Sequence, residues 1–237
     1  MTRKTYFTSD LHLFARHSDG RRYLGAIASK ASGAAAFVLG GDIFDFRWAA
    51  RATLGEAVDE AVDWLAELAI QCPECHFYFL LGNHDSHQAF TIRLAELVQN
   101  TDNMSWHRFY VRMGSNVFLH GDVAERKMTA EVLSYARSRW TNRKKRGRLP
   151  AQVYDLAVRT KLHKPVPYLV YPKKLVARRI LVYLKHIGQG PQNGVKNIYF
   201  GHTHRALQNY QYGGLTFHNG GAPIRGLRFR ILEAAVL

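Results

Sequence analysis

The sequence is poor in cysteine and contains no long hydrophobic run. Only 2 of its 237 residues are cysteine. Two thiols cannot stabilise a chain of this length through disulfides, so we expect an intracellular protein with reduced thiols. No stretch reaches the roughly 18 apolar residues of a membrane-spanning helix. Asp10 interrupts the N-terminal residues before the apolar core of a signal peptide could form. Membrane-spanning and exported proteins are therefore disfavoured, and we expect a cytoplasmic location.

The two cysteines, Cys72 and Cys75, form a Cys-x-x-Cys motif. This spacing also occurs in redox proteins, but alone it is a weak signal because the surrounding sequence is not of the thioredoxin type. We interpret the pair as two small residues at a turn that precedes a strand.

Acidic residues are scarce in one part of the chain. Residues 123–190, here called the basic segment, contain 17 of the 33 Lys and Arg residues but only 3 of the 18 Asp and Glu residues. Nearly all of the formal net charge of +15 therefore lies there. A merely solvated surface usually mixes both signs, so we expect the basic segment to face phosphate groups, nucleic acid or an anionic membrane surface.

The remaining composition, 47% hydrophobic and 12% aromatic, is sufficient for one sizeable domain. Five short apolar runs, each followed by a polar cluster that begins with Asp or Gly or contains His, are typical of strands buried on both faces. The runs cover residues 5–8, 36–39, 77–81, 116–119 and 197–200. We expect every polar cluster to lie at the carboxyl end of a strand.

Helical periodicity appears between these strands. Residues 54–70 carry an apolar stripe, and residues 88–99 form a second helical pattern. Strands that alternate with helices imply crossover units in a layered α/β sheet, in which ligands collect at the carboxyl ends of the strands. Residues 215–218 and 227–232 are interpreted as edge or hairpin strands that close a second sheet.

The basic segment contains two helical patterns, residues 128–140 and 172–187, with Pro172 as the first residue of the second helix and a charged break at residues 142–150. The second helix is amphipathic, with Ile180 and Leu184 on one face and Arg178 on the other. We expect a single domain over residues 1–237 with the basic segment as a helical lid. The apolar face could lie on a membrane, close over acyl chains, or pack on the domain.

The polar clusters supply seven side chains that can bind metal. They are Asp10, His12, Asp42, Asn83, His120, His202 and His204. Oxygen together with imidazole ligands suits Mn, Fe or Zn, whereas an all-oxygen shell favours Mg or Ca. Seven ligands are too many for one ion and suit two ions that share a bridging carboxylate. Alternate residues of a strand point the same way, so each Asp-x-His or His-x-His pair is expected to act together.

These clusters are similar to the signature blocks of the calcineurin-like metallophosphoesterases. The blocks are Asp-Leu-His at 10–12, Gly-Asp-Ile-Phe-Asp at 41–45, Gly-Asn-His-Asp at 82–85, His-Gly-Asp at 120–122 and Gly-His-Thr-His at 201–204. The resemblance implies a layered α-β-β-α sandwich with two mixed sheets. It also implies one metal on Asp10, His12, Asp42 and His204, and a second metal on Asp42, Asn83, His120 and His202. His84 falls where the family keeps a non-ligand histidine beside the substrate.

Within the superfamily, the sequence resembles the branch that contains UDP-2,3-diacylglucosamine pyrophosphatase. The resemblance rests on residues 41–45 followed by Trp48, on the basic insertion after His120, and on Gly-His-Thr-His-Arg at 201–205. It implies an acylated nucleotide-sugar as substrate. One position differs, because His84 stands where that branch typically has Arg.

A mechanism follows from these parts. Two cations, Mn most readily and Fe or Zn as alternatives, can hold a bridging hydroxide for in-line attack on a phosphodiester or pyrophosphate. His84 is expected to donate a proton to the leaving group, with Asp85 as the partner of its other nitrogen. Asp45 and Asp122 are expected to accept hydrogen bonds from ligand imidazoles or backbone amides. Arg205 is expected either to bind a substrate phosphate or to form a surface salt bridge.

Two other functions stay open at this stage. A nuclease or nucleotide phosphodiesterase could bind nucleic acid through the basic residues at 143–148, with Trp140 as a stacking platform. A non-catalytic interaction module could use the basic segment to dock a partner. The leading hypothesis remains hydrolysis of a phosphorylated small-molecule or lipid-linked substrate, with peripheral membrane contact through the basic segment.

Overall fold

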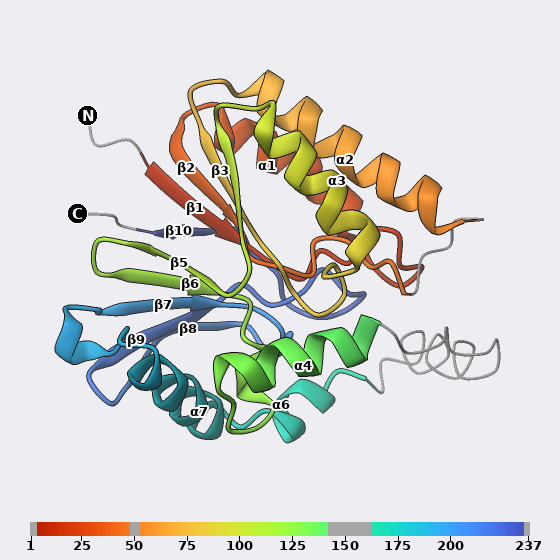
Figure 1. Ribbon diagram of the computed structural model, residues 1–237. Helices are drawn as coiled ribbons and strands as arrows, with labels where there is room; N and C mark the ends of the chain where they lie inside the picture. The colour runs from red at the N-terminus through yellow and green to blue at the C-terminus, as the bar shows by residue number, and fades with distance from the viewer. Residues whose placement is uncertain (1–3, 48–52, 142–162, 235–237) are drawn as a thin grey trace.

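The computed structural model describes residues 4–47, 53–141 and 163–234. Two five-stranded mixed sheets face each other, and helices cover the outer side of each sheet (Figure 1). The predicted α-β-β-α sandwich is therefore confirmed. Within the described ranges, no helix is long and apolar enough to cross a membrane.

The first sheet has the order β10-β1-β2-β3-β4, with β1 to β4 parallel and β10 antiparallel to β1. Helices α1, α2 and α3 lie on its outer face (Figure 1). The bounds are β1 Lys4–Thr8, α1 Leu24–Ala31, β2 Ala34–Leu39, α2 Leu54–Gln71, β3 His76–Leu80, α3 Gln88–Gln99, β4 Met104–His107 and β10 Leu232–Ala234.

Helix α2 illustrates how closely the sequence pattern sets this half. A capping box fixes its start, because the Thr53 side chain accepts from the Glu56 backbone N–H while the Glu56 side chain accepts from Thr53 N–H. Its apolar stripe, including Ala61 and Leu65, is buried against the sheet. The predicted helices at 54–70 and 88–99 are confirmed to within one residue.

The second sheet has the order β5-β6-β7-β9-β8. Helices α4, α6 and α7 lie on its outer side (Figure 1). The bounds are β5 Tyr110–Met113, β6 Asn116–Leu119, α4 Ala130–Thr141, α6 Val166–Val170, α7 Lys173–His186, β7 Asn197–Phe200, β8 Leu207–Tyr212 and β9 Leu215–Asn219. The helices of this layer come from the basic segment. The predicted charged break at residues 142–150 and Trp48 lie outside the described residues.

The apolar face of α7 packs on the second sheet. Ile180 and Leu184 are buried in one cluster with Ile198 of β7 and Phe217 of β9. Of the three uses considered for this face, packing on the domain is the one observed. Pro172 precedes the helix rather than opening it, because its ψ of 128° is extended.

Two expectations about strands were wrong. Residues 227–231 form no regular strand, and β10 joins the first sheet beside β1, with Glu233 opposite Tyr6, instead of closing the second sheet. The free edge of β1 supplies backbone groups that β10 satisfies. Strands β4, β5 and β8 were missed because most of their residues are exposed or half-exposed, so they lack a continuous apolar run.

The cysteine pair is structural. Cys72 ends α2 and Cys75 precedes β3, and both are buried free thiols. Burial raises the pKa of Cys72, and burial together with Cys72 raises the pKa of Cys75 to about 12. Neither thiol is activated for redox chemistry, which agrees with the interpretation from sequence.

Candidate metal centre

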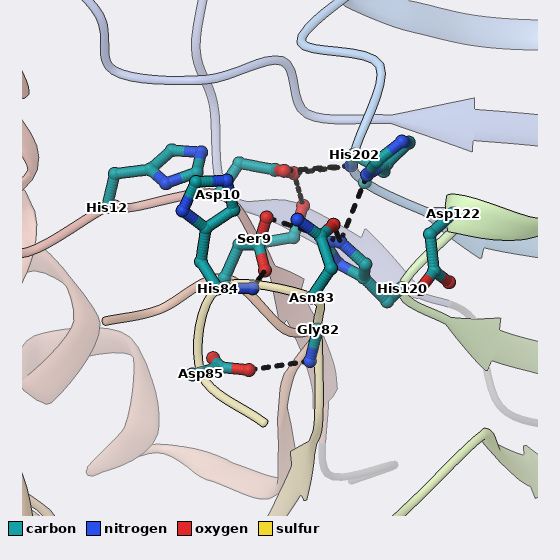
Figure 2. Close-up of polar contacts among 12 residues, drawn as sticks. Ser9, Asp10, His12, Gly82, Asn83, His84, Asp85, His120, Asp122 and His202 are labelled. Atoms are coloured by element: carbon teal, nitrogen blue, oxygen red, sulfur yellow. Dashed lines mark hydrogen bonds and ion pairs between the residues drawn. The ribbon is translucent and has the colours of Figure 1, made fainter. Parts of the chain in front are cut away.

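The predicted polar clusters meet at one end of the sandwich (Figure 2). They follow β1, β2, β3, β6 and β7, so side chains from both sheets face one another across the interface. The structure brings together six of the seven predicted ligands in groups of metal-binding atoms: Asp10 with His12 and His204, and Asp42 with His120 and His202. Asn83 joins the second group, because its Oδ1 lies 3.2 Å from His120 Nε2.

The donor atoms in these groups fit divalent cations. His12 Nε2 lies 3.0 Å from His204 Nε2, and His202 Nδ1 lies 3.3 Å from His120 Nε2. His120 Nε2 is also 3.3 Å from Asp42 Oδ2. Imidazole nitrogens and carboxylate oxygens that converge in this way suit Mn, Fe or Zn. A third group joins Asp42 to His12 and His84, so Asp42 lies in two of the three groups, consistent with a shared carboxylate.

The electrostatics show competition between protons and cations for these atoms. Burial lowers the pKa of His120, but the nearby Asp42 carboxylate outweighs burial and raises this pKa to about 10. Burial raises the pKa of Asp42, but the imidazoles of His120 and His84 outweigh burial and hold this pKa well below its usual range. His204 differs, because burial and the neighbouring imidazole of His12 lower its pKa. Positive charge is thus favoured around Asp42, where a shared cation ligand is expected.

The side chains converge through left-handed turns rather than through strand alternation. Strand β1 ends at Thr8, before Asp10 and His12, and β7 ends at Phe200, before His202 and His204. Five predicted ligands have positive φ angles, in the left-handed region: Asp10 54°, His12 45°, Asp42 52°, His202 65° and His204 52°. Non-glycine residues adopt this region rarely, at a typical cost of about 1–3 kcal/mol each. Strain concentrated at the metal centre is typical of a functional site.

Backbone approach at the site requires glycine at two positions. A Cβ at Gly82 would collide with the Asp42 carboxylate, and a Cβ at Gly201 would collide with Asp10 and Ser9. The freed space lets backbone amides reach the carboxylates. His202 N–H donates to Asp10 Oδ1 at 2.8 Å, and Ser9 Oγ donates to Asp10 Oδ2 at 2.6 Å.

His84, expected to be a non-ligand, lies with His12 and Asp42 in the third group of potential metal-binding atoms (Figure 2). Its expected partner was wrong. Asp45, not Asp85, faces His84 Nδ1 at 2.9 Å, and the same carboxylate lies 3.4 Å from His12 Nδ1. Asp45 thus contacts a ligand imidazole, as expected. Burial lowers the pKa of His84, but the carboxylates of Asp45 and Asp42 outweigh burial and raise this pKa to about 9.

Asp85 instead stabilises the backbone behind the site. Its carboxylate accepts from Gly82 N–H at 2.6 Å and from Ile43 N–H at 2.9 Å. These bonds tie the loop after β3 to the loop after β2. The side chain is completely buried, so a positioning role replaces the expected pairing with His84.

Asp122 also differs from expectation. It pairs in a bidentate manner with Arg137 of α4, with Nε–Oδ2 at 2.7 Å and Nη2–Oδ1 at 2.9 Å, rather than accepting from a ligand imidazole. Burial opposes the shift, but Arg137 lowers the pKa of Asp122. The pair joins the basic segment to the loop that carries His120.

Among the residues that the structure describes, Arg205 forms no salt bridge. Its Nη1 donates to the Tyr171 carbonyl at 2.9 Å, and its guanidinium lies 4.8 Å from the centre of the Tyr168 ring. These contacts hold Arg205 against α6. Binding of substrate phosphate by Arg205 stays a prediction.

Two residues at the site, Glu125 and Arg47, were missed by the sequence analysis, and Trp140 was expected only as a stacking platform for nucleic acid. Glu125 Oε1 lies 3.1 Å from His202 Nε2. The Trp140 ring of α4 lies 5.2 Å from the His84 ring, and Arg47 lies 4.7 Å from the Trp140 ring. A signal existed for Glu125 alone, because it is one of only 3 acidic residues in the basic segment.

Comparison with known proteins identifies the family. The family model of the calcineurin-like phosphoesterases matches residues 3–206. A crystal structure of a dimetal phosphatase from Danio rerio aligns with a TM-score of 0.49 and 11% sequence identity, covering 100% of this chain and 99% of that chain. No curated protein sequence matches the chain significantly. The extent of the family match shows that the chain belongs to the calcineurin-like phosphoesterases and is a metal-dependent phosphoester hydrolase.

Proposed function

We propose that the protein hydrolyses a phosphodiester or pyrophosphate bond in a lipid-linked or nucleotide-sugar substrate, with two divalent cations, Mn²⁺ foremost. The observation that carries the hydrolytic part is the convergence of candidate ligand atoms in three overlapping groups. Asp42 lies in two of them, one with His120 and His202 and the other with His12 and His84. Mixed oxygen and nitrogen donors favour Mn²⁺, Fe²⁺ or Zn²⁺ over Mg²⁺.

The cations would activate a water molecule and screen the phosphoryl charge during in-line displacement. The protein side chains orient the reaction. Asp42 and Asp10 hold the cations, and their geometry is set by backbone donors, His84 N–H to Asp42 at 2.8 Å and His202 N–H to Asp10. These bonds keep the carboxylates in place while the substrate enters.

His84 is the proposed proton donor to the leaving oxygen. Asp45 accepts from Nδ1, which leaves Nε2 available for the substrate, and a raised pKa keeps the imidazole protonated at neutral pH. Trp140 packs against this imidazole and limits its motion. A general acid in this position contributes typically 10²- to 10⁴-fold to the rate.

The proposal of an amphiphilic substrate is supported by α6. Tyr168, Leu169 and Val170 are exposed on this helix, and the adjoining Tyr171 ring lies 6.0 Å from His202. Apolar side chains at the rim of a metal centre favour a substrate with an acyl chain, presented in the cytoplasm or at its membrane face. This role is proposed for α6 because the apolar face of α7 is buried.

Cleavage of nucleic acid is the alternative that the same experiment tests. The basic residues that would bind nucleic acid, at 143–148, lie outside the described residues. A non-catalytic module is not favoured, because the complete ligand set converges on one site.

The proposal is tested with metal-free protein reloaded with Mn²⁺, Zn²⁺, Fe²⁺ or Mg²⁺. Bis-p-nitrophenyl phosphate, p-nitrophenyl phosphate, a nucleotide-sugar diphosphate with and without acyl chains in mixed micelles, and single-stranded DNA are compared as substrates. We expect metal-dependent turnover with kcat/KM highest for the acylated diphosphate. Fastest cleavage of DNA, with steep salt dependence, would instead support a nuclease. No turnover of any phosphoester with any metal would refute the hydrolase.

A further inference from the structure

His202 is enclosed by residues of the basic segment rather than by its own sheet. Glu125 Oε1 lies 3.1 Å from its Nε2, and the Tyr171 ring packs at 6.0 Å. Its other nitrogen, Nδ1, faces His120 Nε2 at 3.3 Å. The two ring nitrogens therefore point to different partners, one to a carboxylate and one to the metal-binding group around Asp42.

This geometry determines which tautomer His202 adopts. A carboxylate beside Nε2 favours a proton on Nε2, which leaves the lone pair of Nδ1 for a cation. Glu125 belongs to neither group of metal-binding atoms, so it acts on the site only through His202.

Glu125 is itself held by helix α7. Nη1 of Arg179 donates to the carbonyl oxygens of Ala124 at 2.7 Å and of Glu125 at 2.6 Å. These carbonyls belong to the short turn Asp122–Ala124 and the residue that follows it. Because Ile180, the next residue of α7, is completely buried in the second core, Arg179 projects from a fixed helix.

We propose that Glu125 is a positioning residue for His202, and that Arg179 sets Glu125, so that α7 controls how tightly one of the two cations is held. The inference rests on the two-cation site of the proposed function. It assigns a purpose to the contact between Arg179 of α7 and the backbone at Glu125. A carboxylate behind a metal-binding histidine typically changes metal affinity 10- to 100-fold.

The test measures binding of Co²⁺ to the metal-free full-length protein by calorimetry and by its visible absorption spectrum. His120→Ala and His204→Ala first assign the two binding steps to the two donor groups. We expect Glu125→Ala to weaken the His120 step about 10- to 100-fold and to change its spectrum, while the His204 step is unchanged. Glu125→Gln, which retains an acceptor oxygen, is expected to lose less.

Arg179 provides the second arm. Arg179→Gln should weaken the same step, and the double variant with Glu125→Ala should bind no worse than Glu125→Ala alone, because Arg179 acts through Glu125. Arg178→Gln is the matched control, since Arg178 is an exposed neighbour on the same helix. It should leave both steps unchanged.

Each of the other possible results would overturn a specific part of the proposal. Equal weakening of both steps means general structural damage, and unchanged affinity in Glu125→Ala means that the contact is incidental. Effects of Glu125→Ala and Arg179→Gln that add in free energy break the proposed order of action. If the unaltered protein fails to bind two Co²⁺ ions, the two-cation site itself is refuted, and this inference with it.

Discussion

The two halves of the sandwich contribute to the metal centre in different ways. The first sheet supplies the carboxylates, and backbone amides hold them: Asp42 accepts from His84, and Asp85 accepts from Gly82 and Ile43. The second sheet supplies three of the predicted imidazole ligands, His120, His202 and His204, whereas His12 follows β1 of the first sheet. One of the three, His202, is contacted by Glu125 of the basic segment.

The two halves therefore have different roles at the metal centre: the first provides fixed negative charge, and the second provides a ligand that can adjust. Buried carboxylates fixed by backbone amides cannot move without disrupting the first sheet, so they provide the permanent negative charge that attracts cations. The His202 imidazole contacts Glu125, whose backbone carbonyl accepts from Arg179 of α7, so this imidazole can respond to the layer that the basic segment forms. We therefore expect loss of a carboxylate ligand to abolish metal binding, and changes in the basic segment behind His202 to tune it.

The largest expected effect comes from the first half. Asp42→Ala removes the carboxylate shared by two donor groups, so we expect loss of both cations and abolition of activity. Metal content by elemental analysis and turnover of bis-p-nitrophenyl phosphate check this together. Asp59→Ala, at an exposed position of α2, is the control. Retention of two cations by Asp42→Ala would contradict the central place of this residue.

His84 tests whether a residue of the first half can act on the reaction without holding metal. We expect His84→Ala to keep both cations but to slow turnover by roughly 10² to 10⁴, the range of a general acid. Because Asp45 and Asp42 raise the pKa of His84, the activity supported by its protonated form should fall as the pH rises through about 9, and this limb should vanish in His84→Ala. A loss of metal equal to that of Asp42→Ala would instead make His84 a ligand.

The same division explains what could be predicted from sequence. Asp10, Asp42 and His120 were identified because each follows a short, continuous apolar strand, and local pattern places such residues at a strand end. The contacts of Glu125 and Arg137 could not be identified, because they depend on how α4 and α7 pack across a sheet. The partner of His84 was misassigned to the adjacent Asp85, since only the folded loops bring Asp45 to the imidazole.

The attachment of the basic segment to the second half gives the next prediction. Asp122→Asn leaves the buried guanidinium of Arg137 without its charged partner, so we expect the free energy of unfolding to fall by about 3–5 kcal/mol at pH 7. Urea unfolding of the metal-free protein measures this loss. Asp59→Asn, which breaks an exposed pair with Arg93, should cost less than about 1 kcal/mol.

The pH dependence of this loss identifies its cause. Arg137 lowers the pKa of Asp122 in the folded protein despite its burial, so the stabilisation is complete above the pKa of the unfolded chain, about 4, and decreases as the pH falls through the folded value. The difference in free energy between the unaltered protein and Asp122→Asn should therefore be constant near neutral pH and shrink below about pH 4. A difference that persists unchanged at lower pH would mean that shape, rather than charge, joins the basic segment to the loop of His120.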